Sequence, residues 1–270
     1  MSAVRVFVLG SSSLGNALLF ASAKTRVLVD GGVGPRVAAE RLRAMGEELL
    51  PRGIDGIVVT HQHDDHAAKV GALARATGAP VWLHDGIDVP RVRKKSNVKR
   101  YDTHASFHIG DFTVEAFALP HDAPQVALRV SSNGLTVGVV TDSGYVPRGL
   151  DRFLGACDEV LLESNYCPEL LELSEYPPSV RRRISGPEGH LSNADAASLV
   201  ARLEGTRVVR VHLCHISQNS NTAERALEVV SRRAKHIEVS VIPPAGGCVL
   251  EIQERPRPSG GFVQLGLFGT

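Results

Sequence analysis

Three histidines and an aspartate fall within six residues of the sequence. They are His61, His63, Asp65 and His66, and they follow directly after a short apolar run. Imidazole and carboxylate groups suit zinc, manganese or iron, and a tight loop can direct them at two ions at once. The spacing predicts a metal site. A solvent-exposed, His-rich loop is the alternative for this segment taken alone.

Further ligand candidates stand at the ends of other β-rich runs. Asp30, His121, Asp142 and His215 each follow such a run within two residues. Ligands of layered α/β sheets gather beyond the carboxyl ends of the strands. We therefore expect these four side chains to lie close to the histidine segment.

The elements that must position these residues alternate along the chain. Strands are expected at 4–9, 17–20, 26–29, 56–59, 112–119, 135–140, 159–162 and 208–214, and helices at 35–50, 67–77, 193–203 and 222–235. Strands that alternate with helices predict an α/β layered fold. We expect a single domain over residues 1–253, followed by a short tail, 254–270, of different composition.

The composition is that of a globular chain and excludes several classes of protein. Of the 270 residues, 43% are apolar and 22% charged, which excludes wholesale disorder. The net charge of +1 excludes a uniformly basic surface for nucleic acid. The four cysteines form no C-x-x-C pair, which excludes a disulfide scaffold and indicates a cytoplasmic location. No apolar run approaches the roughly 18 residues of a membrane span, so no membrane association is expected.

The segment 60–66, together with the later His121, Asp142 and His215, resembles the metallo-β-lactamase superfamily, whose fold is a four-layer αβ/βα sandwich. The resemblance implies two divalent ions, Mn²⁺ or Zn²⁺. One ion would be held by His61, His63 and His121, and the other by Asp65, His66 and His215. Asp142 would bridge the ions, and Asp30 would support the histidine segment from behind. Two such ions can stabilise both the attacking and the leaving oxygen of a hydrolysis.

Two later motifs indicate a branch of this superfamily. Glu163-Ser164-Asn165 and Gly189-His190-Leu191-Ser192 resemble the Glu and His motifs of the phosphodiesterase branch, as in tRNase Z. The resemblance implies that His190 meets the scissile phosphate and that Glu163 orients it. A proton-donating histidine suits a phosphodiester, because its alkoxide leaves poorly without protonation. The predicted catalytic residues are Asp65, His190 and Glu163. The alternative for His190 is a loop residue that merely precedes a helix.

Over residues 4 to about 250, the sequence resembles the YycJ-like (WalJ) family of bacterial metallo-β-lactamase-fold nucleases. The similarity rests on the motifs at residues 9–16, 120–123, 141–145, 182–193 and 215–217. The resemblance implies a 5′→3′ DNA exonuclease with manganese-type metals and a role in DNA repair or replication. Members of the family usually have a histidine where this chain has Tyr166, so a role in substrate contact at that position is not expected here.

Other activities remain open at this stage. An RNase of the tRNase Z type, or a small-molecule phosphodiesterase, would use the same metals. A thioester hydrolase of the glyoxalase II type would share the metals but gives no reason for the pair Glu163 and His190. A catalytically idle binding module is the alternative from another class, and the complete set of ligands speaks against it.

Two groups of cations are candidates for contact with nucleic acid. Arg181, Arg182 and Arg183 lead toward His190, and guanidinium groups match phosphate oxygens. Arg93, Lys94 and Lys95 belong to a cationic run at 91–100, which either contacts phosphates or forms a solvated loop.

The tail contains a short apolar peptide after a linker rich in Pro, Gly and Arg. Residues 264–268 resemble the Gln-Leu-x-Leu-Phe peptide by which bacterial replication and repair proteins bind the sliding clamp. The residues that would bind are Gln264, Leu265, Leu267 and Phe268. Two leucines and a phenylalanine are anchors for an apolar pocket, and the glutamine supplies a directional amide. The alternative is a last edge strand packed on the sheet.

Overall fold

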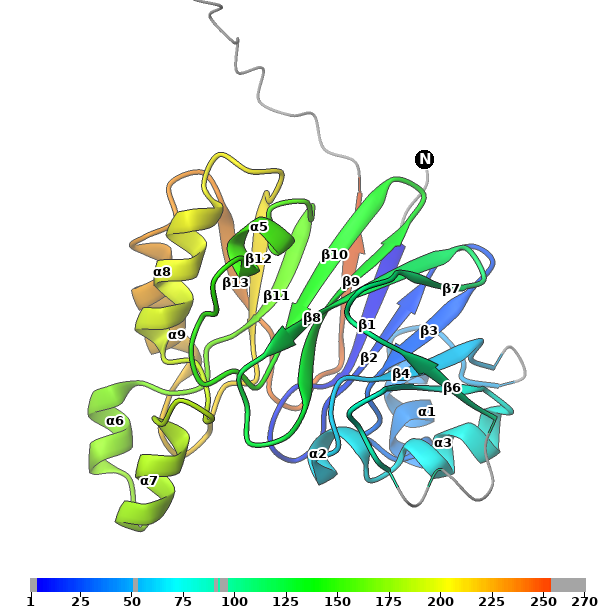
Figure 1. Ribbon diagram of the computed structural model, residues 1–270, viewed down its shortest axis with the longest axis horizontal. Coiled ribbons are helices and arrows are strands. Elements are labelled where there is room, and N and C mark those ends of the chain that lie inside the picture. Colours follow the sequence, from blue (N-terminus) through cyan, green and yellow to red (C-terminus); the bar gives the residue numbers. More distant parts are fainter. Residues whose placement is uncertain (1–3, 51–52, 90–91, 93–96, 254–270) are drawn as a thin grey trace, which may run out of the picture.

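Two seven-stranded sheets lie face to face in the computed structural model, which describes residues 4–50, 53–89, 92 and 97–253 (Figure 1). The first sheet has the order β14-β1-β2-β3-β4-β5-β6, and the second β13-β12-β11-β10-β9-β8-β7. The strands of the first sheet are β1 (Val4–Gly10), β2 (Ala17–Ala21), β3 (Arg26–Val29), β4 (Gly56–Val59), β5 (Val81–His84), β6 (Val98–Tyr101) and β14 (Cys248–Ile252). The strands of the second are β7 (Phe107–Ile109), β8 (Phe112–Leu119), β9 (Gln125–Ser132), β10 (Leu135–Val140), β11 (Glu159–Glu163), β12 (Arg210–Cys214) and β13 (Glu238–Val241).

Apolar side chains cover both faces of the sheets. In β1, Val6 and Val8 point into the cluster between the two sheets, whereas Phe7 and Leu9 pack in a second cluster outside the first sheet. This alternation follows from the two-residue period of a strand. Because both faces are buried, such strands have continuous apolar sequences rather than alternating ones.

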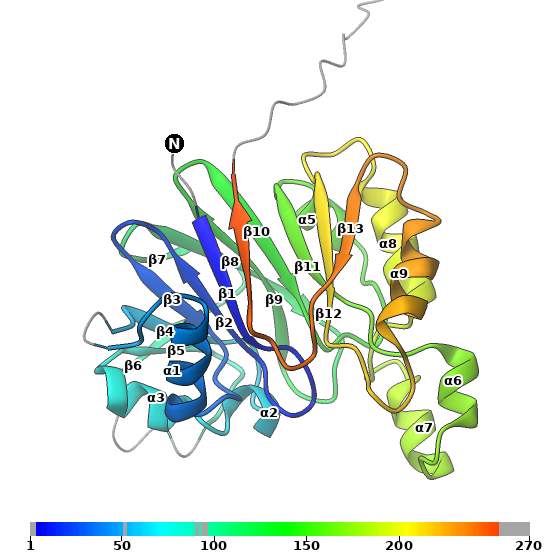
Figure 2. The ribbon, with the colours of Figure 1, turned by 180° about the vertical axis from the view of Figure 1, so that it is seen from behind.

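Helices cover the outer face of each sheet, as Figure 2 shows from behind. The first sheet is covered by α1 (Pro35–Ala44) and α3 (Val70–Thr77). The second is covered by α5 (Leu150–Leu154), α8 (Asn193–Leu203) and α9 (Ala223–Ser231). The predicted four-layer αβ/βα sandwich is confirmed.

The predicted helices are present, but three of them have different ends. The helix expected at 35–50 ends at Ala44, because Gly46 adopts a φ of 75°, which is typical of a helix end. The helix expected at 67–77 is divided into α2 (Asp64–Ala67) and α3. The helix expected at 222–235 is the shorter α9. Helix α8 matches its prediction, and Ser192 and Asp195 form a capping box at its start.

A helical hairpin that the sequence did not predict follows β11. It consists of α6 (Pro168–Leu173) and α7 (Pro178–Ile184), and it projects from the sandwich in Figures 1 and 2. Each helix begins with a proline, whose fixed φ suits the first turn. Tyr166 packs with Leu171 and Ile184 in a small apolar cluster at the hairpin. Tyr166 is therefore a packing residue.

Some predictions lie outside the described residues. They concern Arg93, Lys94 and Lys95 of the cationic run and the tail 254–270, with its docking residues 264–268. Within the described part of the chain, no helix is both long and apolar enough to cross a bilayer.

Candidate metal centre

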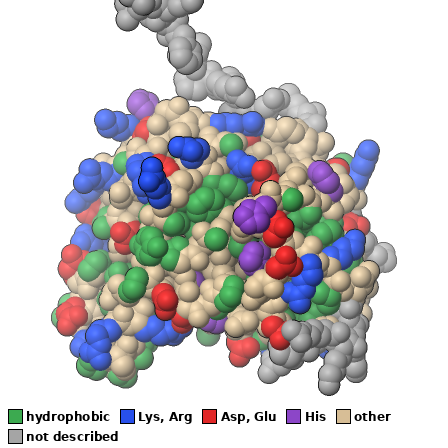
Figure 3. Space-filling model, viewed as in Figure 1, with side chains coloured by type: hydrophobic (Ala, Val, Ile, Leu, Met, Phe, Trp, Pro, Cys, Tyr) green, Lys and Arg blue, Asp and Glu red, His purple; other side chains and the backbone are tan. Residues whose placement is uncertain are grey.

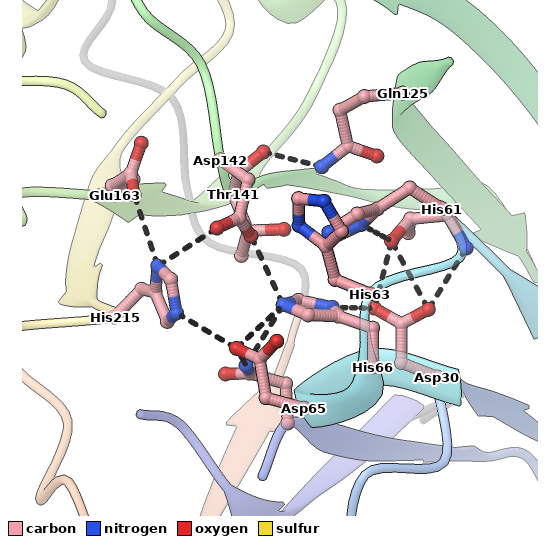
Figure 4. A network of polar contacts seen from close by, with 12 residues as sticks. Asp30, His61, His63, Asp65, His66, Gln125, Thr141, Asp142, Glu163 and His215 are labelled. Carbon is pink, nitrogen blue, oxygen red and sulfur yellow. Dashed lines mark hydrogen bonds and ion pairs between the residues drawn. The ribbon is translucent and has the colours of Figure 1, made fainter. Parts of the chain in front are cut away.

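The polar residues that follow the strands of both sheets meet at one edge of the sandwich (Figure 4). Asp30 follows β3, Asp142 follows β10 and His215 follows β12. These three residues adopt φ angles of 61°, 56° and 51°, which only a few per cent of non-glycine residues do. Such a conformation costs about 1–3 kcal/mol and persists only where the surroundings enforce it. Here the backbone turns sharply as each strand ends and directs the side chain into the cluster.

The first group of candidate ligands is histidine only. His61, His63 and His121 each offer a nitrogen within 4.8 Å of the others. The Nδ1 atom of His63 lies 3.2 Å from Nε2 of His121. The Nε2 atom of His61 is buried and has no hydrogen-bond partner in the described part of the chain. Burial, together with the nearby His66, lowers the pKa of His61 well below its usual value, which favours the neutral imidazole that a metal requires.

The second group combines imidazole with carboxylate. Asp65, His66 and His215 offer ligand atoms within 4.8 Å of one another. The Nε2 atom of His66 lies 3.0 Å from Asp142 and 3.5 Å from Asp65, and Nε2 of His215 lies 3.6 Å from Asp65. Burial alone would lower the pKa of His66, but Asp142 and Asp30 raise it to about 10. The carboxylates thus stabilise positive charge at this point, as a cation site requires.

Asp142 connects the two groups. Its carboxylate lies within 4.8 Å of ligand atoms of His61 and His66, and also of His215. The buried Nε2 of His215, like that of His61, has no hydrogen-bond partner among the described residues. Unpartnered buried nitrogens are costly unless a metal or other group satisfies them. The donor set therefore fits two divalent ions.

Each of the five imidazoles is held through its other nitrogen, and this orients the ligating nitrogen toward the cluster. The partners and distances are Thr60 Oγ1 for His61 Nδ1 (3.1 Å), Asp122 Oδ1 for His63 Nε2 (3.0 Å), Asp30 Oδ2 for His66 Nδ1 (2.7 Å), the Gly189 carbonyl for His121 Nδ1 (3.1 Å) and Glu163 Oε1 for His215 Nδ1 (2.9 Å). Asp30 also accepts hydrogen bonds from the backbone N–H and the hydroxyl of Thr60. Asp30 thus lies where the sequence predicted support for the histidine segment.

Glu163 and His190 adjoin this centre. One oxygen of Glu163 accepts from Nδ1 of both His190 (2.8 Å) and His215 (2.9 Å), and the other accepts from the backbone N–H of Ser143 and Leu191. Burial would raise the pKa of Glu163, but His190 and His215 lower it to about 2. Burial also opposes protonation of His190, yet Glu163 raises the pKa of His190 above its usual value. Glu163 has no exposed surface, so it positions two histidines and does not itself reach a substrate.

The three predicted arginines of α7 lie in different environments. Arg181 donates to the carbonyl of Glu172 within the hairpin, and Arg183 donates to Asp122. The side chain of Arg182 is exposed and forms no ion pair or hydrogen bond with another described residue. Figure 3 shows cationic side chains gathered at the lower left, over the hairpin. Arg182 is the arginine of α7 that is available for an external anion.

The sequence did not single out two residues that contact the centre. The Nδ2 atom of Asn16 lies 2.8 Å from Nε2 of His66 and 3.2 Å from Asp65. Asp122 contacts His63 as described above. Asn16 lies in the motif at 9–16 and Asp122 in the motif at 120–123. Their place in these motifs was the signal that could have identified them as site residues. Spacing alone did not reveal their contacts, because Asn16 is separated from His66 by 50 positions.

Comparisons with known proteins agree with this geometry. Residues 25–213 match a family model described as "Beta-lactamase superfamily domain". The chain is 32% identical over 232 residues to exodeoxyribonuclease YycJ of Bacillus anthracis, which covers 83% of this chain and 87% of that protein. It is 29% identical over 228 residues to exodeoxyribonuclease WalJ of Streptococcus pneumoniae. This match covers 81% of this chain and 84% of WalJ. The crystal structure of the metallo-β-lactamase fold protein YhfI from Bacillus subtilis superposes with a TM-score of 0.71 at 20% identity, over 93% of this chain and all of the other.

Proposed function

Because the chain belongs to the metallo-β-lactamase superfamily, and is thereby a metal-dependent hydrolase, we propose that it is a nuclease, specifically a 5′→3′ DNA exonuclease of repair or replication. The observation that carries this proposal is the pair of Glu163 and His190 beside the metal centre, at 2.8 Å. A phosphodiester needs such a proton donor at its leaving oxygen, whereas a thiolate leaves without one. Similarity to relatives named exodeoxyribonucleases supports DNA as the substrate.

Each residue of the centre has a role in this proposal. His61, His63 and His121 would hold one ion, and Asp65, His66 and His215 the other, with Asp142 shared. When bound, the ions supply Lewis-acid charge and activate water for attack on phosphorus. Asp65, besides its role as a ligand, would accept the proton of the attacking water. His190 would donate a proton from Nε2 to the departing sugar oxygen, because Glu163 occupies its Nδ1.

The arginines of α7 and the cationic run are proposed to contact the phosphate backbone. Arg182 is the best placed of these residues, since it is exposed and unpaired within the described part of the chain. The other residues of this group are Arg181, Arg183, Arg93, Lys94 and Lys95. Replacement of one phosphate-contacting cation reduces the slope of log affinity against log salt by about 1. We expect this change for Arg182→Ala.

Within the tail, Gln264, Leu265, Leu267 and Phe268 are proposed to dock on the bacterial sliding clamp. The eight residues 254–261 could span roughly 25 Å if extended, which is enough to separate the peptide from the catalytic domain. Docking would raise the local concentration of DNA at the enzyme. Leu267→Ala with Phe268→Ala should abolish clamp binding and clamp-stimulated digestion while basal activity persists. Loss of folding or of basal activity would instead show that the tail packs on the domain.

One assay separates the candidate activities. DNA and RNA of the same sequence, labelled at either end, are incubated with the protein and Mn²⁺ or Zn²⁺ beside a glutathione thioester. We expect DNA to be shortened from its 5′ end, and Asp142→Ala to remove this activity. Digestion of RNA alone would favour the tRNase Z-type alternative. Hydrolysis of the thioester without attack on nucleic acid would overturn the proposal.

A further inference from the structure

Helix α7 is joined to the metal centre by a chain of two polar contacts. Arg183 donates from Nε to Oδ2 of Asp122 at 3.1 Å, and its Nη2 lies 3.1 Å from the same oxygen. The other oxygen of Asp122 lies 3.0 Å from Nε2 of His63. A carboxylate can only accept a proton, so this ion-pair contact favours the His63 tautomer that carries its proton on Nε2. The lone pair of Nδ1 then faces His121 and the centre.

The loop that follows α7 holds the neighbouring histidine. The carbonyl of Gly189 accepts from Nδ1 of His121 at 3.1 Å. Nε2 of His121 then faces Nδ1 of His63 at 3.2 Å and Oδ1 of Asp122 at 3.3 Å. Gly189 has little room to move, because its N–H donates to Gly186 and a Cβ at this position would lie 2.2 Å from the Ile184 carbonyl. Two of the three histidines of the first group are thus oriented by α7 and its loop.

The second group of ligands, Asp65, His66 and His215, is oriented by residues that are more deeply buried. Asp30, which orients His66, has 5% of its side chain exposed, and Glu163, which orients His215, has none. By contrast, Asp122 is 30% exposed, His63 31% and Arg183 60%. Water competes with exposed ion pairs, so each contributes little on its own. Among the contacts that orient the five imidazoles, the contact between Asp122 and His63 is therefore the one most open to competition from water.

We infer that Asp122 and Arg183 are positioning residues for the ion held by His61, His63 and His121, and that the α6–α7 hairpin thereby sets the affinity of this site. The site is the weaker of the two, and its ion exchanges while the ion at Asp65, His66 and His215 remains. The inference rests on the metal centre of the proposed function but not on the identity of the substrate. Arg183 accordingly forms an ion pair with Asp122, and this pair competes with any contact between Arg183 and a phosphate.

The test is a stepwise titration of the metal-free protein with Mn²⁺ or Zn²⁺, in which calorimetry measures the affinity of each step. Metal analysis after dialysis then measures how many ions remain bound. We expect two binding steps. Loss of a partner that orients a ligand typically costs 10–100-fold in metal affinity. Asp122→Ala should weaken one step by about this factor and leave the other unchanged. Arg183→Ala should weaken the same step by a few-fold, since Asp122 remains. The step concerned should be the one that His63→Ala removes.

The matched control is Arg182→Ala, which removes an adjacent arginine whose side chain forms no ion pair or hydrogen bond with a described residue. Its two metal affinities should equal those of the unmodified protein. The double variant Asp122→Ala/Arg183→Ala should be no weaker than Asp122→Ala alone, because Arg183 acts only through Asp122. Thermal unfolding with chelator present shows whether each variant is folded before metal is added.

Three outcomes would overturn the inference. They are unchanged metal affinity in a folded Asp122→Ala protein, equal weakening of both steps, and additive effects of the two substitutions. Failure of the nuclease proposal is a separate result: a protein that binds two ions as described but digests no nucleic acid refutes that proposal and leaves this inference intact.

Discussion

The strands β11 and β12 carry two buried histidine–glutamate pairs, and the pairs differ in whether the imidazole keeps a nitrogen without a hydrogen bond. Toward the beginning of β11, His212 uses both ring nitrogens, Nε2 with Glu159 at 2.8 Å and Nδ1 with Ser240 at 2.7 Å. At the other end, His215 contacts Glu163 through Nδ1, and its buried Nε2 has no hydrogen-bond partner among the described residues. Both histidines are therefore buried and paired with a glutamate. His215 differs from His212 because its Nε2 makes no hydrogen bond with a described residue and faces Asp65 at 3.6 Å.

Backbone geometry marks the same difference. His212 lies within β12, in register with Leu161 and Ser240. His215 lies just beyond the strand with a φ of 51°, and Asn165 donates to its carbonyl at 2.9 Å. A strained residue that several neighbours hold in place is typical of functional sites. A buried histidine with both nitrogens satisfied is typical of structural ones.

The largest effect is expected when a ligand of the centre is removed. His61→Ala or Asp142→Ala should lower the bound metal and reduce hydrolysis by more than about 10³-fold, because the metals supply several kcal/mol of transition-state stabilisation. Metal analysis and a nuclease assay check this result. Near-normal turnover in a variant shown to lack metal would contradict the role of the centre.

Loss of the proposed proton donor is expected to have the next largest effect. His190→Ala should keep its metal and lose about 10²–10⁴-fold in rate on DNA, which is the usual contribution of positioned proton transfer. The loss should shrink on a nitrophenyl phosphodiester, whose leaving group needs no proton. Equal losses on both substrates would indicate a binding role for His190.

The two glutamates of β11 allow a matched comparison. Glu163→Gln leaves one acceptor oxygen for four donors, namely two imidazoles and two backbone N–H groups. Metal affinity should fall by about 10–100-fold. Glu159→Gln, four residues earlier on the same strand, should leave both metal affinity and rate unchanged. If the two variants behaved alike in metal titrations, the distinction between the ends of the strand would be wrong.

The smallest effect on activity is expected at His212. His212→Ala should retain metal content and turnover, and should lose about 1–3 kcal/mol of stability, because Glu159 and Ser240 lose a buried partner. Denaturant unfolding and the nuclease assay measure the two quantities separately. A loss of metal in this variant would mean that the two ends of the strands are coupled.

Much of the fold could be predicted because its signals are local. Short apolar runs identified most of the strands, since strands buried on both faces need continuous apolar sequence. Helix α8 was predicted at its observed ends, and the capping box of Ser192 and Asp195 that the structure shows at its start spans only four residues. The α6–α7 hairpin was missed because its two helices, of six and seven residues, are too short to show a helical period.

The sequence by itself determined the chemistry of the centre, because residue type decides which atoms can bind a metal. The spacing of His61, His63, Asp65 and His66 already indicated ligands, and the ends of the other strands supplied candidates to complete the set. Only the tertiary structure decided how those ligands are held. Asn16, Asp122 and Gly189 reach the centre from loops that lie 50, 59 and 68 positions from the histidines they contact. Such contacts depend on the packing of two sheets and a hairpin, which no local pattern specifies.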